Sequence, residues 1–302
     1  MRVGAISKRQ LSQRAAFTLI IIATAIVVVP VLVIVLQIIT NGASAISWEF
    51  LTQVPSQAGK AGGILPAIVG TFFLMLGTII VALPLGVMAG IYLAEYSRDN
   101  WLTRSINLAI VNLAGVPSIV YGLFGLGIFV LLFHFGMSLL SASLTLACQA
   151  LAMTVTTSRE AILAVTREHR EGSLAVGVTK WQTIRHIVLP QALPGIVTGA
   201  VLAMSRAAGE TAPILVVGAA FFIPGLPHSP FDQFMALPYH LYTLGAHVPG
   251  IPKSTVWGVA LVLMVVVLFF NVIATIIRLR TRKRGGLDYE NGCRIFEKEK
   301  GS

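Results

Sequence analysis

Six long blocks of apolar residues are the feature that most constrains how this chain of 302 residues folds. Each block has about 20 apolar residues or more, enough for a helix to cross the hydrocarbon core of a bilayer. Charged residues make up only 11% of the chain, too few to cover the surface of a soluble domain. The sequence therefore predicts an all-α polytopic membrane protein with six transmembrane helices. The blocks are Ala15–Ile39, Ile64–Leu93, Ile106–Phe133, Met137–Thr157, Leu193–Phe222 and Thr255–Ile277.

The basic residues predict the orientation in the membrane. Nineteen of the 22 Lys and Arg residues lie in the N-terminal leader, the second and fourth loops and the tail, whereas the loops on the other side hold only Lys60 and Lys253. Short loops rich in Lys and Arg stay in the cytoplasm. Both termini are therefore expected in the cytoplasm, as an even number of spans requires. Topology also accounts for the net charge of +10, so no nucleic-acid partner is expected.

Two charged residues, Arg206 and Glu210, interrupt the fifth block within VLAMSRAAGETAPILVV (201–217). An arginine at the centre of a lipid-facing helix costs at least about 2.5–3.5 kcal/mol. Residues four apart share a face of one helix, so the pair is expected to point together into the protein interior or a wet cavity. Two interpretations stay open. The pair is either a structural ion pair, or an anion site in which the fork of Arg206 binds two oxygens, while Glu210 holds the fork and repels the anion enough for it to leave.

Glycine and proline predict three local features. Gly86 and Gly90 have the spacing that lets membrane helices approach closely. The glycines around Pro117 predict a kink in the third block. The proline-rich stretch 224–253 predicts a compact outer loop with one short helix at Phe231–Ala236. Its histidines, at irregular spacings, do not predict a metal site; they are His228, His240 and His247.

The fourth loop, from Ser158 to about Ala192, is unusually long for a membrane protein. Its pattern predicts an amphipathic helix that ends at Gly177, because glycine adopts the left-handed conformation at a helix end without strain. A second helix is expected from about Thr179 to Ile187. Two such helices form a compact knob of the kind that docks to a partner. A solvated connector is the alternative interpretation.

Five residues of this loop carry a family resemblance. Their spacing resembles the EAA…G…I.LP loop of permease subunits of ABC-type importers, except that Gly172 and Ser173 replace the two alanines usual there. The five are Glu171, Gly177, Ile187, Leu189 and Pro190.

Three further stretches resemble the A-type, PstA-like permease of the bacterial high-affinity phosphate importer, within the family of binding-protein-dependent transport inner-membrane components. They are GTIIVALPLGVMAGIYLAEY (77–96), NLAGVPSIVYGLFGLGIFV (112–130) and SRAAGETAPIL (205–215).

The resemblance implies a MetI-like importer transmembrane domain in the bacterial inner membrane. A leader, first span and outer loop (1–63) would precede a permease core (64–279), and a basic, disordered tail (280–302) would follow it. Within the core, the coupling loop 158–190 would fit a groove on an ATPase subunit. The implied partners are a C-type permease subunit, two ATPase subunits and an extracytoplasmic phosphate-binding protein, besides membrane lipid. In this family the charged pair at Arg206 and Glu210 is tied to the passage of phosphate.

The energy for transport has to come from a partner. The chain has no GxxxxGK[ST] sequence to hold ATP phosphates, so it is expected to be non-catalytic and to bind no cofactor, with ATP and magnesium on the ATPase subunits. Three alternatives stay open: a permease for another oxyanion such as sulfate or molybdate, a secondary transporter, and a membrane scaffold in phosphate sensing. The docking loop argues against the secondary transporter, and the buried charge pair argues against the scaffold.

Overall fold

The computed structural model describes residues 3–56, 61–175, 177–223 and 225–299, and these are mostly helical. Segment η1 is a 3-10 helix and segments η3, η4 and η5 are π-helical. The elements in chain order are α1 (Val3–Gly42), η1 (Ala43–Ala45), α2 (Trp48–Thr52), β1 (Pro55–Ser56), β2 (Ala61–Gly62), α3 (Leu65–Ile91), η3 (Tyr92–Tyr96), α4 (Trp101–Ala114), α5 (Ser118–Gly125), η4 (Leu126–Leu132), α6 (Leu139–Leu163), α7 (Arg167–Ala175), α8 (Lys180–Thr183), η5 (Ile184–Val188), α9 (Leu189–Gly209), α10 (Ala212–Val217), α11 (Leu237–Ala246) and α12 (Lys253–Glu299).

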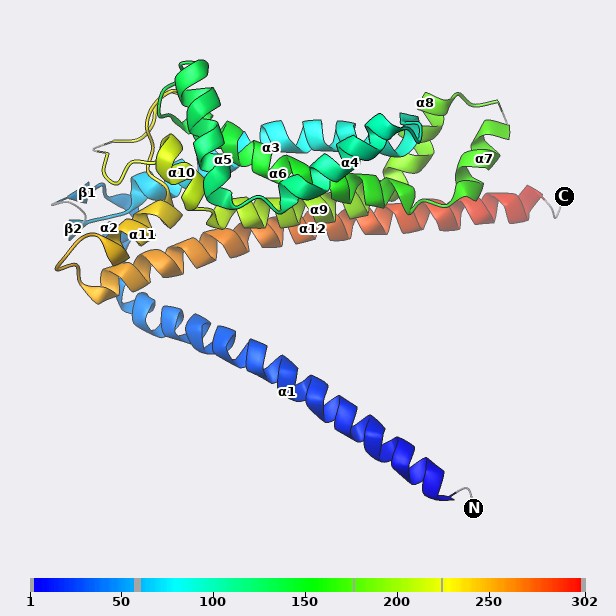
Figure 1. Ribbon diagram of the computed structural model, residues 1–302, viewed down its shortest axis with the longest axis horizontal. Helices are drawn as coiled ribbons and strands as arrows, with labels where there is room; N and C mark the ends of the chain where they lie inside the picture. The colour runs from blue at the N-terminus through cyan, green and yellow to red at the C-terminus, as the bar shows by residue number, and fades with distance from the viewer. Residues whose placement is uncertain (1–2, 57–60, 176, 224, 300–302) are drawn as a thin grey trace.

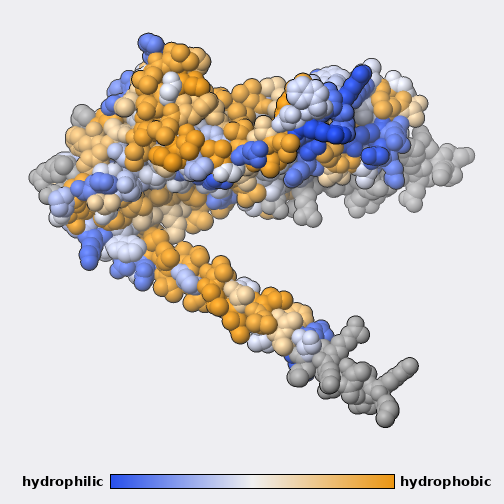
Figure 2. All heavy atoms as spheres, viewed as in Figure 1, coloured by the Kyte–Doolittle hydropathy of each residue, from blue (hydrophilic) through white to orange (hydrophobic). Residues whose placement is uncertain are grey.

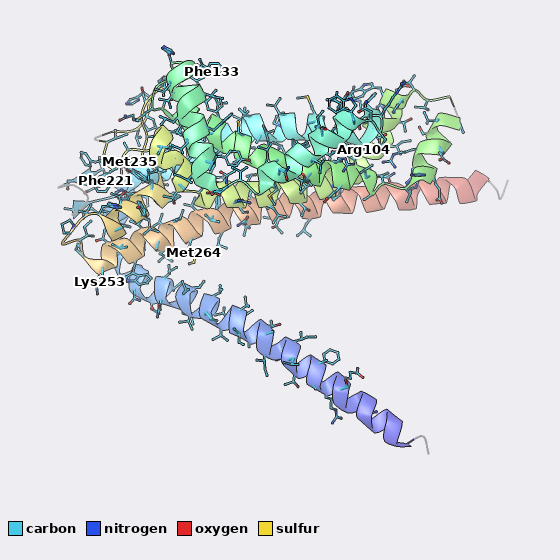
Figure 3. All side chains as sticks on the ribbon, viewed as in Figure 1. Arg104, Phe133, Phe221, Met235, Lys253 and Met264 are labelled. Atoms are coloured by element: carbon cyan, nitrogen blue, oxygen red, sulfur yellow. The ribbon has the colours of Figure 1, made fainter. Side chains whose placement is uncertain are left out.

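Five helical segments of the described chain are long and apolar enough to cross a membrane, and a sixth is added if one bent pair counts as a single span. The bent pair is Trp101–Ala114 and Ser118–Leu132, which meet at 107°. The bend falls at Gly115–Pro117, where proline removes a backbone donor and restricts the preceding residue, so the expected kink is confirmed. α5 with η4 consequently leaves the direction that the neighbouring helices share, and Phe133 marks its tip (Figures 1 and 3).

α3, α6 and α9 form the packed centre of the molecule. Gly86 and Gly90 of α3 lie directly against Thr154 and Ser158 of α6; a Cβ added to Gly86 would be only 2.6 Å from the Thr154 side chain. Gly195 brings α9 equally close to α6. The expectation of close packing through small residues is thereby confirmed, and it makes α3 and α6 in particular a tightly joined pair.

The two ends of the long axis carry different elements. One end holds α7, α8, the N-terminal end of α1 and the C-terminal end of α12. The other end holds α2, the antiparallel β1–β2 pair and α11 (Figure 1). Hydrophilic side chains gather toward the ends, and apolar side chains cover the middle and most of α1 (Figure 2). Arg104 lies toward the first end and Lys253 at the second (Figure 3). This arrangement agrees with the inference from the basic residues that the end with α7 and α8 faces the cytoplasm. Lys60 lies outside the described residues.

α1 stands apart from the other helices (Figure 1). It contacts them near its C-terminal end, where Gly42 lies against Trp257 and Leu261 of α12. Its most apolar window is entirely exposed within the chain. A helix that satisfies its own backbone and exposes apolar side chains in this way suits a lipid environment.

The outer loop differs from the sequence-based expectation. Phe231–Ala236 is not helical, and the helix of this loop, α11, begins at Leu237 with Pro238 in its first turn, a position that proline favours. Phe234 is fully buried, and its carbonyl accepts from Ala220 N at 2.8 Å. Tertiary contacts of an extended segment therefore outweigh its local pattern.

The tail, for which disorder was expected, is described in part as helix, and the expectation of disorder stays a prediction. α12 continues as a helix to Glu299. The membrane-spanning part of α12 is already helical, so each added residue extends an existing hydrogen-bond ladder and the cost of helix nucleation does not arise again.

Candidate functional site

The fifth apolar block is not one helix. α9 ends at Gly209, Glu210 has an extended backbone with ψ of 127°, and α10 begins at Ala212 with Pro213 in its first turn. Glycine weakens a helix, and proline favours the start of one, so the local sequence explains this break. The expectation that Arg206 and Glu210 share one helix face is therefore wrong. Glu210 lies in the break between two helices.

The two charges are nevertheless in contact, since Arg206 Nε lies 3.4 Å from Glu210 Oε1. The closer partner of Glu210 is Gln149 of α6, whose Nε2 donates to the same oxygen at 2.6 Å. The Glu210 side chain is only 14% exposed, whereas that of Arg206 is 54% exposed. Within the described residues Arg206 makes no other hydrogen bond or ion pair, so its two terminal nitrogens are free to donate to a ligand.

Arg206 borders an open cavity of about 280 Å³ that residues of α4, α5, α6 and α9 line. At about 30 Å³ for each water molecule, this space accommodates a small hydrated anion. Among the described residues that line it, Arg206 alone carries a full charge. The uncharged polar residues of the lining are Tyr121, Gln149, Thr156 and Thr157. The arrangement is one cation with neutral hydrogen-bonding groups in an otherwise apolar chamber, which suits an oxyanion.

Sequence reasoning missed Gln149 and Tyr121. Gln149 could have been found from the sequence, because its amide is isolated inside the fourth apolar block. Polar groups buried in membrane helices usually bind another polar group. Tyr121 donates its hydroxyl to Leu113 O at 2.8 Å, across the bend between α4 and α5. Ser205, beside Arg206, donates to Asn271 Oδ1 of α12 and so fastens this end of α9 to α12.

The cytoplasmic loop forms the expected knob of two short helices. Gly177 lies between α7 and α8 with φ of +82°, so the expectation of a left-handed glycine at the end of the first helix is confirmed. Thr179 caps α8 and forms a capping box with Gln182. Ser173, where the resembling family has alanine, is buried and shares a 2.9 Å hydrogen bond with Thr183. This bond fixes α7 to α8.

The second loop helix does not stop at Ile187, as the sequence suggested. α8 continues through η5 into α9, and together they form one span from Lys180 to Gly209. Pro190 cannot donate a backbone hydrogen bond, and the wider π-helical turn just before it accommodates this loss. Leu189 packs against a buried cluster formed by Ile162, Val165, Val188, Ala192 and Ile196.

The two groups of predicted site residues lie at opposite ends of α9. Ile187, Leu189 and Pro190 are at its start, and Arg206 is 17 residues beyond Leu189, about 25 Å along the helix axis. The structure thus does not bring them into one site. The loop end exposes Glu171 together with two large apolar side chains, Leu174 (49% exposed) and Trp181 (56%). Exposed apolar side chains on a charged knob are typical of a docking surface.

The outer-loop histidines lie in different environments. His240 is buried and stacks on Phe221 with ring centroids 5.7 Å apart, whereas His228 and His247 are exposed. Burial lowers the pKa of His240 to about 4. Among the described residues, no three His, Cys, Asp or Glu side chains gather where they could hold a metal ion.

Solved structures of importers share this fold. One is described as the MetNI methionine ABC transporter in inward-facing conformations, with a TM-score of 0.57, 20% sequence identity, and coverage of 72% of this chain and 94% of that one. Another is a bacterial ABC transporter involved in the import of the acidic polysaccharide alginate, with a TM-score of 0.61, 14% identity, and coverage of 93% and 99%. The expected fold of an importer transmembrane domain is confirmed.

Sequence comparisons define the family. The family model described as "Binding-protein-dependent transport system inner membrane component" matches residues 86–283. The phosphate transport system permease protein PstA 1 of Mycobacterium tuberculosis is 33% identical over 287 residues, which cover 92% of each chain. The probable ABC transporter permease protein YqgI of Bacillus subtilis is 34% identical over 250 residues, or 78% of this chain and 85% of the relative. This chain belongs to the family of inner-membrane components of binding-protein-dependent transport systems.

Proposed function

We propose that this chain is the multi-pass permease subunit of an ATP-driven importer that carries inorganic phosphate into the cytoplasm. The near full-length similarity to a phosphate transport permease supports the choice of substrate. The observation that carries the proposal is the cavity beside Arg206, whose terminal nitrogens have no partner in the described chain. No observation favours a secondary transporter, a scaffold or another oxyanion.

Arg206 is the group that attracts and orients the anion. Its planar guanidinium presents two parallel donors to two phosphate oxygens. Unit charges 4 Å apart attract by about 1 kcal/mol in water and about 4 kcal/mol at an effective dielectric constant of 20. Since Arg206 is half exposed, the attraction lies between these values.

Glu210 acts as a fixed negative charge next to this site. Gln149 holds its carboxylate in place at 2.6 Å, so Glu210 stays near Arg206 without occupying the guanidinium. A carboxylate there repels the bound phosphate and keeps Arg206 from binding it too tightly for release. The sequence suggested the same two roles for Glu210, holding the guanidinium and repelling the anion.

The knob formed by α7 and α8 is the docking element for an ATPase subunit. Glu171, Leu174 and Trp181 are its exposed side chains, and they lie at the cytoplasmic end of the molecule. ATP and magnesium then belong to the ATPase subunits. A C-type permease subunit completes the translocation path, two ATPase subunits drive it, and an extracytoplasmic phosphate-binding protein delivers phosphate at the end that carries α2 and α11.

Reconstitution of the complex in proteoliposomes tests this function. We expect radiolabelled phosphate to enter only when ATP and the binding protein are both present. A tenfold excess of sulfate or molybdate should leave the initial rate nearly unchanged. Uptake driven by an ion gradient without ATP, or strong competition by sulfate, would contradict the proposal.

A further inference from the structure

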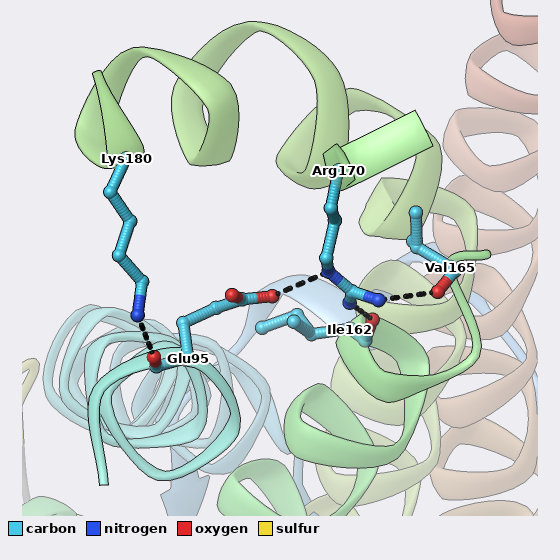
Figure 4. A network of polar contacts seen from close by, with 5 residues as sticks. All are labelled: Glu95, Ile162, Val165, Arg170 and Lys180. Atoms are coloured by element: carbon cyan, nitrogen blue, oxygen red, sulfur yellow. Dashed lines mark hydrogen bonds and ion pairs between the residues drawn. The ribbon is translucent and has the colours of Figure 1, made fainter. Parts of the chain in front are cut away.

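A partly buried ion pair joins the docking loop to the end of α3. Arg170 Nε of α7 lies 3.0 Å from Glu95 Oε1 of η3, with the side chains only 18% and 10% exposed (Figure 4). The Arg104–Asp99 pair at the same end is as short, at 2.8 Å, but its side chains are 71% and 74% exposed. Exposed pairs of that kind contribute little, whereas a shielded pair holds its partners in one geometry.

Arg170 is also bound to a third element. Its two terminal nitrogens donate to Ile162 O and Val165 O, each at 2.6 Å (Figure 4). Ile162 lies in the last turn of α6 and Val165 just beyond it, where the helix dipole favours positive charge. One guanidinium therefore ties α7 to both α6 and η3.

α8, the second helix of the knob, contacts the same segment. Lys180 donates to the backbone carbonyl of Glu95 (Figure 4), and its ammonium lies 4.9 Å from the centre of the Tyr96 ring. The latter is within the range of a cation–π interaction. Both helices of the knob are thus fastened to residues 92–96.

Residues 92–96 are connected to the wall of the cavity through α3 and α6. They form a π-helical turn that continues α3, and π-helical turns are frequent at functional sites. α3 is packed against α6 where Gly86 and Gly90 leave room for the side chains of Thr154 and Ser158. α6 in turn supplies Gln149, Thr156 and Thr157 to the cavity. A displacement of the knob therefore reaches the cavity through rigid, contiguous elements.

We propose that Glu95 and Arg170 are positioning residues that transmit movement of the docking loop to α3 and α6, and so couple ATP hydrolysis to phosphate transport. The proposal rests on the proposed function, since it takes the loop to be the ATPase docking element. The loop motif itself includes neither residue. The fork of Arg170 fixes direction as well as distance, because three of its nitrogens are bound to three different groups.

The test measures phosphate imported per ATP hydrolysed by the complete complex in proteoliposomes. Glu95→Gln should keep the ATPase subunits bound and ATP hydrolysis active, while the transport ratio falls about tenfold, as expected when a coupling contact is lost. Arg170→Lys keeps the charge but cannot make all three donations, so its ratio should be intermediate. Asp99→Asn is the matched control, because it breaks the exposed pair at the same end, and its ratio should equal that of the wild type.

A second experiment replaces the ion pair between residues 95 and 170 with a covalent cross-link. Glu95→Cys with Arg170→Cys, in a background with Cys148 and Cys293 replaced by serine, should be uncoupled when reduced and regain coupling when a short bifunctional thiol reagent joins the two sites. An unchanged ratio in Glu95→Gln, or loss of the ATPase subunits in every variant of Glu95 and Arg170, would overturn the proposal. Glu171→Lys tests the docking function separately: it should lose the ATPase subunit, and retention there would refute the docking role alone.

Discussion

Replacement of Arg206 by glutamine is the most direct test of the cavity. Glutamine keeps one uncharged donor group on a shorter side chain, and it removes the charge and the fork. The anion loses two charge-assisted hydrogen bonds, each worth about 1.5–3 kcal/mol, of which we take the lower value because Arg206 is half exposed. The total of about 3 kcal/mol corresponds to roughly a hundredfold fall in transport at low phosphate.

Arg206→Lys separates charge from geometry. An ammonium keeps the attraction but lacks the planar fork, so about one of the two bonds is lost and transport should fall about tenfold. The loss of the Arg206–Glu210 contact adds little, because its length is 3.4 Å and Gln149 still holds Glu210. The expected order is therefore wild type, then Arg206→Lys, then Arg206→Gln.

The assay is the initial rate of ATP-driven phosphate uptake into proteoliposomes at low phosphate, with the amount of assembled complex measured in each sample. Arg98→Gln, an exposed arginine outside the cavity, serves as the control and should match the wild type. If the ion pair is only structural, Arg206→Gln will impair assembly and the double variant Arg206→Gln/Glu210→Gln will recover. That outcome, or wild-type uptake by Arg206→Gln, refutes an anion-binding role.

Two further predictions follow from local geometry. Gly177→Ala should destabilise the knob by about 1–2 kcal/mol, because its φ is +82° and the added methyl meets no other atom, so only backbone strain is felt. Gly172→Ala, equally open but within α7, should instead stabilise it by about 0.5–1 kcal/mol; hydrogen exchange of residues 164–188 compares the two, and equal effects would contradict the assignment of strain. Burial lowers the pKa of His240 to about 4, compared with 6.5 in the unfolded chain. The free energy of unfolding should therefore be unaffected by this group above pH 6.5. It should fall as the pH drops from 6.5 toward 4, by about 3 kcal/mol in all, because only the unfolded chain takes up the proton. Thermal unfolding between pH 7 and pH 4 measures this loss, which should be smaller in His240→Phe; an identical pH dependence in that variant would show that another group is responsible.

The sequence by itself determined the membrane class, the number of spans to within one and the form of the cytoplasmic loop, and it predicts their sidedness. Each of these depends on local composition. A span needs only enough apolar residues in succession, and Gly177 needs only to be the residue that tolerates a left-handed turn. Gly86 and Gly90 were likewise readable as a packing face, because helix periodicity places them together.

The tertiary structure alone decided which polar groups meet. Gln149 and Glu210 are 61 residues apart in the sequence, and Glu95 and Arg170 are 75 apart. No periodicity of a single helix relates such residues; their contacts depend on how separate helices pack. The break at Glu210 is a different case, because Gly209 and Pro213 mark it in the local sequence, although the hydropathy of the block does not. Local patterns set what each segment can form, whereas the cavity and the Glu95–Arg170 ion pair arise where segments meet.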